Sequence, residues 1–133
     1  MQTFLPYPSF EMTAQCLDNR RLGNQRNEAS VILNTLRGGK QGWVHHPVVK
    51  MWRGYENALA YYLNTCITEW IRRGFKNNME YAVIDGEIKW PPWLGNEEFH
   101  ASHRSNLLRK DSPFYGKYSW LEPSTLPYVW PVR

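Results

Sequence analysis

The stretch from Asp18 to Gly38, DNRRLGNQRNEASVILNTLRG, determines most of what can be inferred about the fold of this chain. At about 100° of rotation per residue, its leucines and Ala29 fall on one narrow stripe, which predicts an amphipathic helix facing a core. Arg26 falls in the same stripe, where an unpaired guanidinium would be costly to bury. Glu28 lies beside the stripe. Two interpretations are open. Arg26 forms a buried pair with a carboxylate, or Arg26 and Glu28 line a polar site and contact a ligand from two sides.

The composition indicates one globular domain over residues 1–133. Charged residues make up 21% and no segment has low complexity, so we expect no long disordered part. Aromatic residues make up 15%, the net charge is +4 and the pI is about 9.2. These values favour nucleic-acid binding only weakly.

Targeting signals are missing from the sequence. No apolar run is long enough to span a membrane and no signal peptide opens the chain, so we expect a cytoplasmic, nucleoid-associated monomer without membrane contact. The two cysteines, Cys16 and Cys66, lie in apolar helical patterns. We expect them to be reduced core residues rather than a disulfide or zinc ligands.

Three more helices are predicted around the central stretch. Residues 9–17 form a short helix that Ser9 can cap, residues 47–73 form the longest helix, and residues 96–110 form the last one, capped by Asn96. Residues 1–8 contain two prolines and should be extended.

Residues 81–90, YAVIDGEIKW, consist of two short β-branched runs around Asp85-Gly86, which predicts a β-hairpin. The segment after Pro113 is rich in proline and aromatic residues, so we expect it to wrap the surface in defined loops. The predicted fold class is therefore all-α: a single domain of three to four helices, with a small β-hairpin insert and an aromatic-rich C-terminal loop region.

Basic and aromatic residues alternate near the C-terminus. Such interleaving suits phosphate contacts combined with base stacking. A solvated helix end and a packed tail are the alternative, and the two interpretations do not exclude each other. The residues concerned are Arg104, Arg109, Lys110, Phe114, Tyr115, Lys117, Tyr118 and Trp120.

Histidines suggest two further possibilities. His45 and His46 lie where one helix ends and the next begins, and a histidine there can cap a helix or line a site. Glu97, His100 and His103 lie on one helix and could serve a metal-dependent hydrolase, although the His-x-x-His spacing is weak for zinc.

Five short motifs occur in a particular order along the chain. They are Arg26-Asn27-Glu28-Ala29, then Gly38, then Gly42-Trp43 with His46-Pro47, then Arg72-Arg73-Gly74-Phe75, and finally Leu107-Leu108-Arg109-Lys110-Asp111 with Pro113 and Tyr115. This order resembles the pyrimidine-dimer DNA glycosylase family, the endonuclease V group known from a T-even phage and from many bacteria. One departure from the family pattern is Asn27, which separates an arginine and a glutamate that are commonly adjacent.

The resemblance implies an all-α fold in which the N-terminal α-amine lies against the helix that bears the catalytic glutamate. The amine attacks the sugar C1′, the base leaves, a Schiff base forms, and β-elimination nicks the strand. It assigns the glutamate role to Glu28, and it requires no metal or other cofactor. We assign the nucleophile to the amine of Met1, because the bulk of Gln2 should protect the methionine from removal. An α-amine titrates near neutral pH, so an uncharged fraction is available for attack.

The expected partner is double-stranded DNA that contains a damaged or modified base. The predicted DNA-contacting residues are Arg20, Arg21, Arg26, His45, His46, Arg104, Lys110, Tyr115 and Lys117, with the arginines and Lys110 facing one groove and the two histidines at its rim. The alternative is a non-catalytic nucleic-acid-binding protein that retains the fold.

Overall fold

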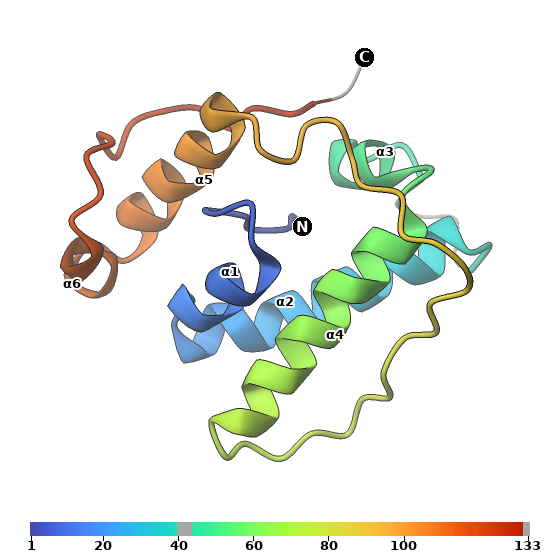
Figure 1. Ribbon diagram of the computed structural model, residues 1–133. Helices are drawn as coiled ribbons and strands as arrows, with labels where there is room; N and C mark the ends of the chain where they lie inside the picture. Colours follow the sequence, from blue (N-terminus) through green and yellow to red (C-terminus); the bar gives the residue numbers. More distant parts are fainter. Residues whose placement is uncertain (40–43, 132–133) are drawn as a thin grey trace.

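The computed structural model describes residues 1–39 and 44–131, and the described part is helical (Figure 1). The predicted all-α class is confirmed. Gly42 and Trp43 of the family motif lie outside the described residues. The helices are α1 (Phe10–Cys16), α2 (Asn19–Leu36), α3 (Pro47–Trp52), α4 (Glu56–Arg72), α5 (Glu97–Lys110) and α6 (Ser112–Tyr115), followed by a 3₁₀ turn (Gly116–Tyr118).

Helices α2 and α4 pack side by side, and α1 packs against α4 (Figure 1). Leu22, Ala29 and Leu33 of the predicted stripe are buried in this layer. Gly23 allows the close approach, since a Cβ at this position would lie 3.1 Å from the Trp70 ring of α4. The apolar spacing of α2 therefore buries the face that the sequence predicts.

The predicted long helix over residues 47–73 is wrong in one respect, because the chain breaks between α3 and α4. Gly54 adopts φ +90°, a conformation that costs other residues steric strain, and Arg53 is extended. Pro47 begins α3, and the His46 side chain caps it by accepting a hydrogen bond from the Val48 N–H. The break turns α3 away from α4.

The predicted β-hairpin does not form, because residues 81–90, all of them described, contain no strand. Side-chain amides of α4 take the place of a partner strand. Asn64 exchanges two hydrogen bonds with the backbone of Ala82, and Asn57 donates to the carbonyl oxygens of Asp85 and Glu87. A lone two-stranded hairpin is only marginally stable in water. Because side chains of α4 already bond the backbone of this segment, pairing its two halves with each other would add no stability.

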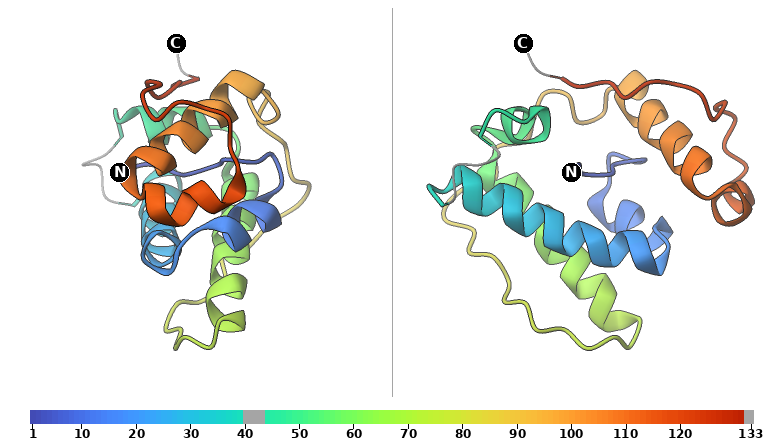
Figure 2. Two further views of the ribbon diagram at one scale, coloured as in Figure 1. Left: turned by 90° about the vertical axis from the view of Figure 1, so that its left-hand side faces the viewer. Right: turned by 180° about the vertical axis from the view of Figure 1, so that it is seen from behind.

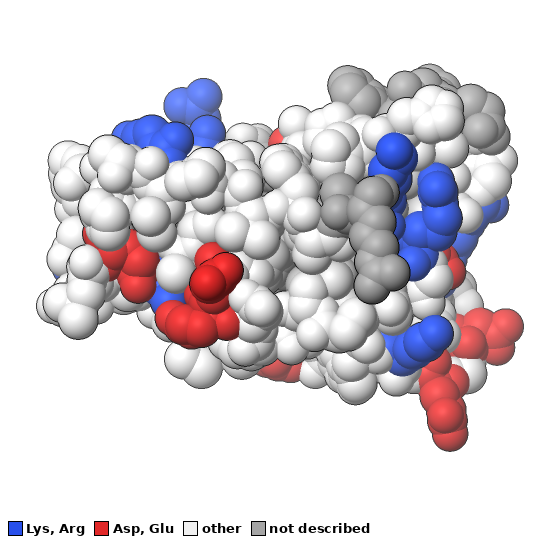
Figure 3. Space-filling model, turned by 90° about the horizontal axis from the view of Figure 1, so that it is seen from above, with Lys and Arg blue, Asp and Glu red and all other residues white. Residues whose placement is uncertain are grey.

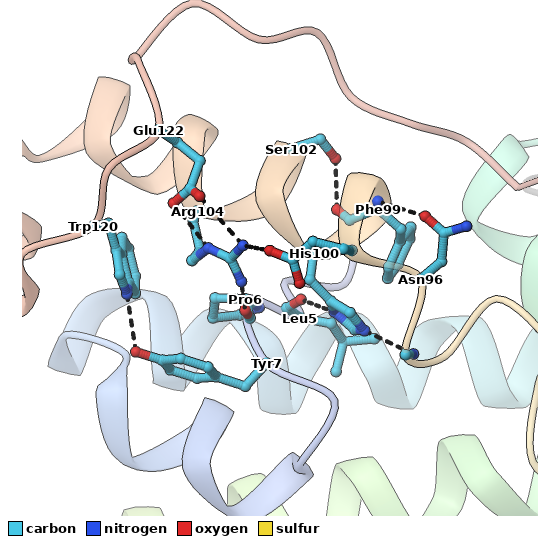
Figure 4. A network of polar contacts seen from close by, with 12 residues as sticks. Leu5, Pro6, Tyr7, Asn96, Phe99, His100, Ser102, Arg104, Trp120 and Glu122 are labelled. Atoms are coloured by element: carbon cyan, nitrogen blue, oxygen red, sulfur yellow. Dashed lines mark hydrogen bonds and ion pairs between the residues drawn. The ribbon is translucent and has the colours of Figure 1, made fainter.

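The N-terminal segment runs between α5 and the layer of α2 and α4, as Figure 1 and the right view of Figure 2 show. Phe4 and Leu5 are buried. The Leu5 N–H donates to His103 Nδ1 at 2.8 Å, and His100 Nδ1 lies 2.7 Å from the Leu5 carbonyl oxygen (Figure 4). The Gly95 N–H donates to His100 Nε2, so the proton of His100 is on Nδ1. The two histidines thus hold the N-terminal segment against α5.

This arrangement removes the basis for a metal site on α5. Three of the four ring nitrogens of His100 and His103 are bonded to backbone groups, and Glu97 contacts Arg104 instead. Among the described residues, no group of His, Cys, Asp and Glu is arranged to hold a metal ion.

Acid should weaken this attachment of the N-terminal segment. Burial, and then the neighbouring His100, lower the pKa of His103 to about 3, so the ring stays neutral in the folded protein. The unfolded chain takes up a proton near pH 6.5, and the folded chain does not until about pH 3. Stability should therefore fall as the pH drops through this window, by up to about 1.4 kcal/mol per pH unit from this group.

Urea unfolding between pH 7 and pH 4 measures this effect. His103→Gln keeps an acceptor for the Leu5 N–H and should flatten the pH dependence, whereas His45→Gln, at an exposed position, should leave it unchanged. Equal slopes in the wild type and His103→Gln would contradict the assignment.

Candidate active site

A polar cavity of about 270 Å³ lies where the N-terminus meets the beginning of α2 and the end of α5. Three cationic side chains and one carboxylate line it together with the chain terminus. The lining residues are Met1, Gln2, Phe4, Arg20, Arg21, Asn24, Gln25, Glu28 and Lys110. The cavity thus brings together both predicted catalytic residues and three of the predicted DNA contacts.

Gln25 connects the N-terminus to Glu28. Its Nε2 donates to the Gln2 carbonyl oxygen at 3.0 Å and to Glu28 Oε2 at 3.1 Å, and its Oε1 accepts from the Phe4 N–H at 2.9 Å. The Gln2 N–H itself lies 3.4 Å from Glu28 Oε2. Gln25 is fully buried, so these bonds are shielded from water. One amide therefore holds the residue after the α-amine against the Glu28 carboxylate.

Arg21 is held at the cavity by carboxylates. Its guanidinium donates to both oxygens of Asp18 at 3.3 Å and lies 3.9 Å from Asp111. Asp18 also accepts a hydrogen bond from the hydroxyl of Tyr115, which is buried. Burial, followed by the bond to Asp18, raises the pKa of Tyr115. Tyr115 therefore supports the site through Asp18 and does not line the cavity.

His46 lies near the α-amine as well as capping α3. Burial, and then the positive charge of the N-terminal amine, lower the pKa of His46. Its ring also contacts Trp130, with 6.0 Å between the ring centroids. The predicted helix cap is therefore present, whereas His46 is not one of the residues that line the cavity. His45 is exposed on the preceding turn.

Arg26 does not line the cavity. Its guanidinium lies 4.3 Å from the centre of the Trp70 ring and donates to Asn77 Oδ1 at 2.7 Å. Burial lowers the pKa of Arg26. Neither interpretation of Arg26 made from the sequence describes this arrangement, because an aromatic ring and an amide replace the expected carboxylate or ligand.

Arg104 and Lys117 are also placed elsewhere. The Arg104 side chain is 10% exposed and contacts Glu97, Glu122 and the Pro6 carbonyl oxygen (Figure 4). Lys117 lies 3.9 Å from the centre of the Phe114 ring. The expectation that all the predicted arginines face one groove is therefore wrong for Arg26 and Arg104, since both are held by internal partners.

The sequence interpretation missed Gln25, Asp18 and Asn24 as parts of the site. Gln25 precedes Glu28 by three residues, a spacing that puts both on one helix face, so a signal for it was present. Nothing in the sequence indicates that Asp18 bonds Tyr115, because 97 residues separate them.

A larger cavity of about 440 Å³ lies between α1 and α4, and its chemistry differs. Glu11, Glu69 and Arg72 line it, together with uncharged polar residues and a few apolar ones. Glu69 already binds Arg72 and Arg73. Its two carboxylates repel phosphate and its one cation, Arg72, is bound to Glu69, whereas three cations line the cavity at the N-terminus. The smaller cavity is therefore the better candidate for nucleic-acid chemistry.

Basic side chains form two separate groups on the face shown in Figure 3, one toward the α5 end and one toward the α3 end.

Within the described residues, no helix is both long and apolar enough to cross a membrane.

Comparison with known proteins identifies the family. Searches of curated proteins and of solved structures give no match. A family model described as pyrimidine dimer DNA glycosylase matches residues 1–83. The matched part contains Met1, Arg20, Arg21, Gln25 and Glu28, and so most of the cavity lining. Since the match covers more than half of the chain, this protein belongs to the pyrimidine dimer DNA glycosylase family.

Proposed function

We propose that the protein is a DNA glycosylase with AP-lyase activity, which excises a damaged or modified pyrimidine through a Schiff base on the Met1 amine. The observation that carries the proposal is the contact between Glu28 and the backbone of Gln2, the residue next to the α-amine, in a cavity that Met1 also lines. Gln25 bonds both the Gln2 carbonyl oxygen and the Glu28 carboxylate, beside cationic residues that suit phosphate.

The chemistry follows from these groups. The uncharged α-amine attacks C1′ of the target nucleotide, and the bond from C1′ to the base breaks as the base leaves with a proton. The Glu28 carboxylate stabilises the positive charge that develops on the sugar and on the iminium nitrogen. The C1′–O4′ bond then opens with a proton going to O4′, and this step leaves the iminium. Removal of a proton from C2′ expels the 3′ phosphate, and water releases the product from the amine. Glu28 is the carboxylate lining the cavity and is suited to move these protons.

Borohydride trapping tests this proposal. Reduction in the presence of an abasic-site duplex should convert the iminium into a stable covalent complex of protein and DNA. Lys110 supplies a second amine to the same cavity, so the attachment point must be mapped by mass spectrometry of the trapped peptide. We expect the cross-link on Met1.

Two controls complete the experiment. Lys110→Arg keeps the charge, removes the rival amine, and should still be trapped. An N-terminal extension should prevent trapping without unfolding the protein. Absence of a trapped species in the wild type would favour the alternative, a DNA-binding protein without lyase activity.

The salt dependence of DNA binding should identify the residues that contact phosphate. Each lost phosphate contact lowers the slope of log K against log salt by about one unit. We expect this change for Arg20→Ala and for Lys110→Ala, both exposed at the cavity, and no change for Arg72→Ala at the end of α4. Equal effects at all three positions would indicate a diffuse basic surface.

A further inference from the structure

The side-chain amide of Gln25 is the point at which α2, α4 and the N-terminal segment meet. Two donors face its oxygen and two acceptors face its nitrogen. They are the Phe4 N–H and the Tyr62 hydroxyl on the oxygen side, and the Gln2 carbonyl oxygen and the Glu28 carboxylate on the nitrogen side. An amide meets both requirements at once, because it carries an acceptor oxygen and two N–H donors. The orientation of the Gln25 amide is therefore fixed from both sides.

Tyr62 holds the oxygen side of this amide from the core. It is fully buried, and its hydroxyl lies 2.6 Å from Gln25 Oε1 and 2.8 Å from the Phe4 carbonyl oxygen. Its ring packs on Phe10 and Trp52, with 5.3 and 6.3 Å between the ring centroids. A phenol packed in this way cannot shift without moving its neighbours. The core of α4 thus sets the position of the Gln25 side chain.

The nitrogen side of the amide holds the two groups on which the proposed reaction depends. One is the backbone of Gln2, next to the α-amine, and the other is the Glu28 carboxylate. A nucleophile and a proton-transferring group must be held in a narrow geometry, and a shift of about 1 Å can cost about 100-fold in rate. Gln25 is itself fully buried, so it affects the substrate through these two groups.

We propose that Gln25 is a positioning residue of this reaction, whose uncharged amide fixes the N-terminus and the Glu28 carboxylate relative to each other, and that Tyr62 fixes the amide. This inference rests on the proposed function and adds two residues to its machinery. A carboxylate at position 25 should not substitute for the amide, because it has no proton to donate and would place a second negative charge against Glu28.

Gln25→Met tests the proposal, since it keeps a similar side-chain volume and removes the hydrogen bonds. We expect single-turnover cleavage of an abasic-site duplex to slow about 10- to 100-fold, because the two reacting groups lose their fixed separation. The affinity for the same duplex should stay within about twofold, because the cations that line the cavity are unchanged. Tyr62→Phe should show the same pattern with a smaller loss. Gln15→Met, exposed on α1 and outside the cavity, is the matched control and should change neither quantity.

Gln25→Glu adds a measurement that a loss of stability alone would not change, the pH dependence of its rate relative to the wild type. Burial and the Glu28 carboxylate favour the protonated form of the new carboxyl group. The phenol hydroxyl, the α-amine and the cations Arg20, Arg21 and Lys110 act in the opposite direction, but position 25 is fully buried and the carboxylate is its direct neighbour. Once protonated, the group is uncharged like the amide and can donate to Glu28 again. The activity relative to the wild type should therefore rise as the pH is lowered.

Hydrogen exchange gives a readout that does not depend on activity. The Phe4 amide should exchange about tenfold faster or more in Gln25→Met, whereas the Leu5 amide, which donates to His103, should not change.

Equal losses of rate and affinity in Gln25→Met, an unchanged rate, or a relative rate of Gln25→Glu that does not vary with pH would overturn the assignment. If Gln25→Met does not fold, Tyr62→Phe and Gln25→Glu provide the same comparison. If the wild type does not cleave the abasic duplex, the proposed function itself fails, and this inference fails with it.

Discussion

Replacing Glu28 with glutamine should slow base release and abasic-site cleavage by about 100- to 10,000-fold, the range typical for the loss of a general acid–base group. Glutamine keeps an oxygen that can accept from Gln25 and from the Gln2 N–H, so the N-terminus should stay in place. It loses the negative charge that would stabilise the cationic sugar and the iminium. The expected result is therefore an inactive protein with a normal fold.

Single-turnover cleavage of an abasic duplex measures the rate, and thermal unfolding checks the fold. Glu98→Gln, at an exposed position on α5 that does not line the cavity, removes the same charge and should retain full activity. DNA affinity of Glu28→Gln should be equal to or higher than that of the wild type, because a negative charge is removed beside phosphate. Retention of full activity in Glu28→Gln would exclude the proposed mechanism.

The largest effect on stability is expected at Arg104. Its guanidinium contacts two carboxylates and the Pro6 carbonyl oxygen while its side chain is 10% exposed. Arg104→Ala would leave Glu122, whose side chain is 18% exposed, and the Pro6 oxygen without this partner. Removing one member of a buried pair costs about 3–5 kcal/mol, and the partial exposure of these groups favours the lower end.

Urea unfolding of Arg104→Ala and Arg72→Ala provides the comparison. Arg72 also binds a buried carboxylate, but its side chain is 66% exposed and Glu69 keeps Arg73 as a partner. Its loss should therefore destabilise the protein much less than the loss of Arg104. Similar losses for the two variants would show that the contacts of Arg104 contribute no more than a surface pair. If the Arg104→Ala variant folds, the salt dependence of its DNA binding should equal that of the wild type. Arg104 is bound to internal partners and is therefore not expected to contact phosphate.

The helices could be predicted from the sequence because their signals are local. Apolar spacing in residues 19–36 requires a buried face, Ser9 and Asn96 bond the N–H groups of the first turns, and Gly38 takes φ +89° where α2 ends. The order of the short motifs likewise indicated the family before any tertiary contact was known.

The elements predicted incorrectly depend on competition between local and distant partners. Asp85-Gly86 favours a turn, and Gly86 does adopt φ +86°, but Asn57 and Asn64 of α4 bond the backbone that a hairpin would have paired. Gly54 is a weak point in a helical pattern, and only packing decides whether a helix continues through it. Short-range patterns cannot rank such alternatives, because the partners lie elsewhere in the chain.

By itself, the sequence determined an all-α protein with a charged helix and named Met1 and Glu28 as a possible catalytic pair. Tertiary structure alone decided which charges share a cavity. Arg20, Arg21 and Lys110 meet at the N-terminus, while Arg26 stacks on Trp70 and Arg104 binds two carboxylates. Periodicity gives the direction in which a side chain points from its own helix. Which residue it contacts depends on the packing of distant segments, as in the hydrogen bond from Tyr115 to Asp18, which are about a hundred residues apart.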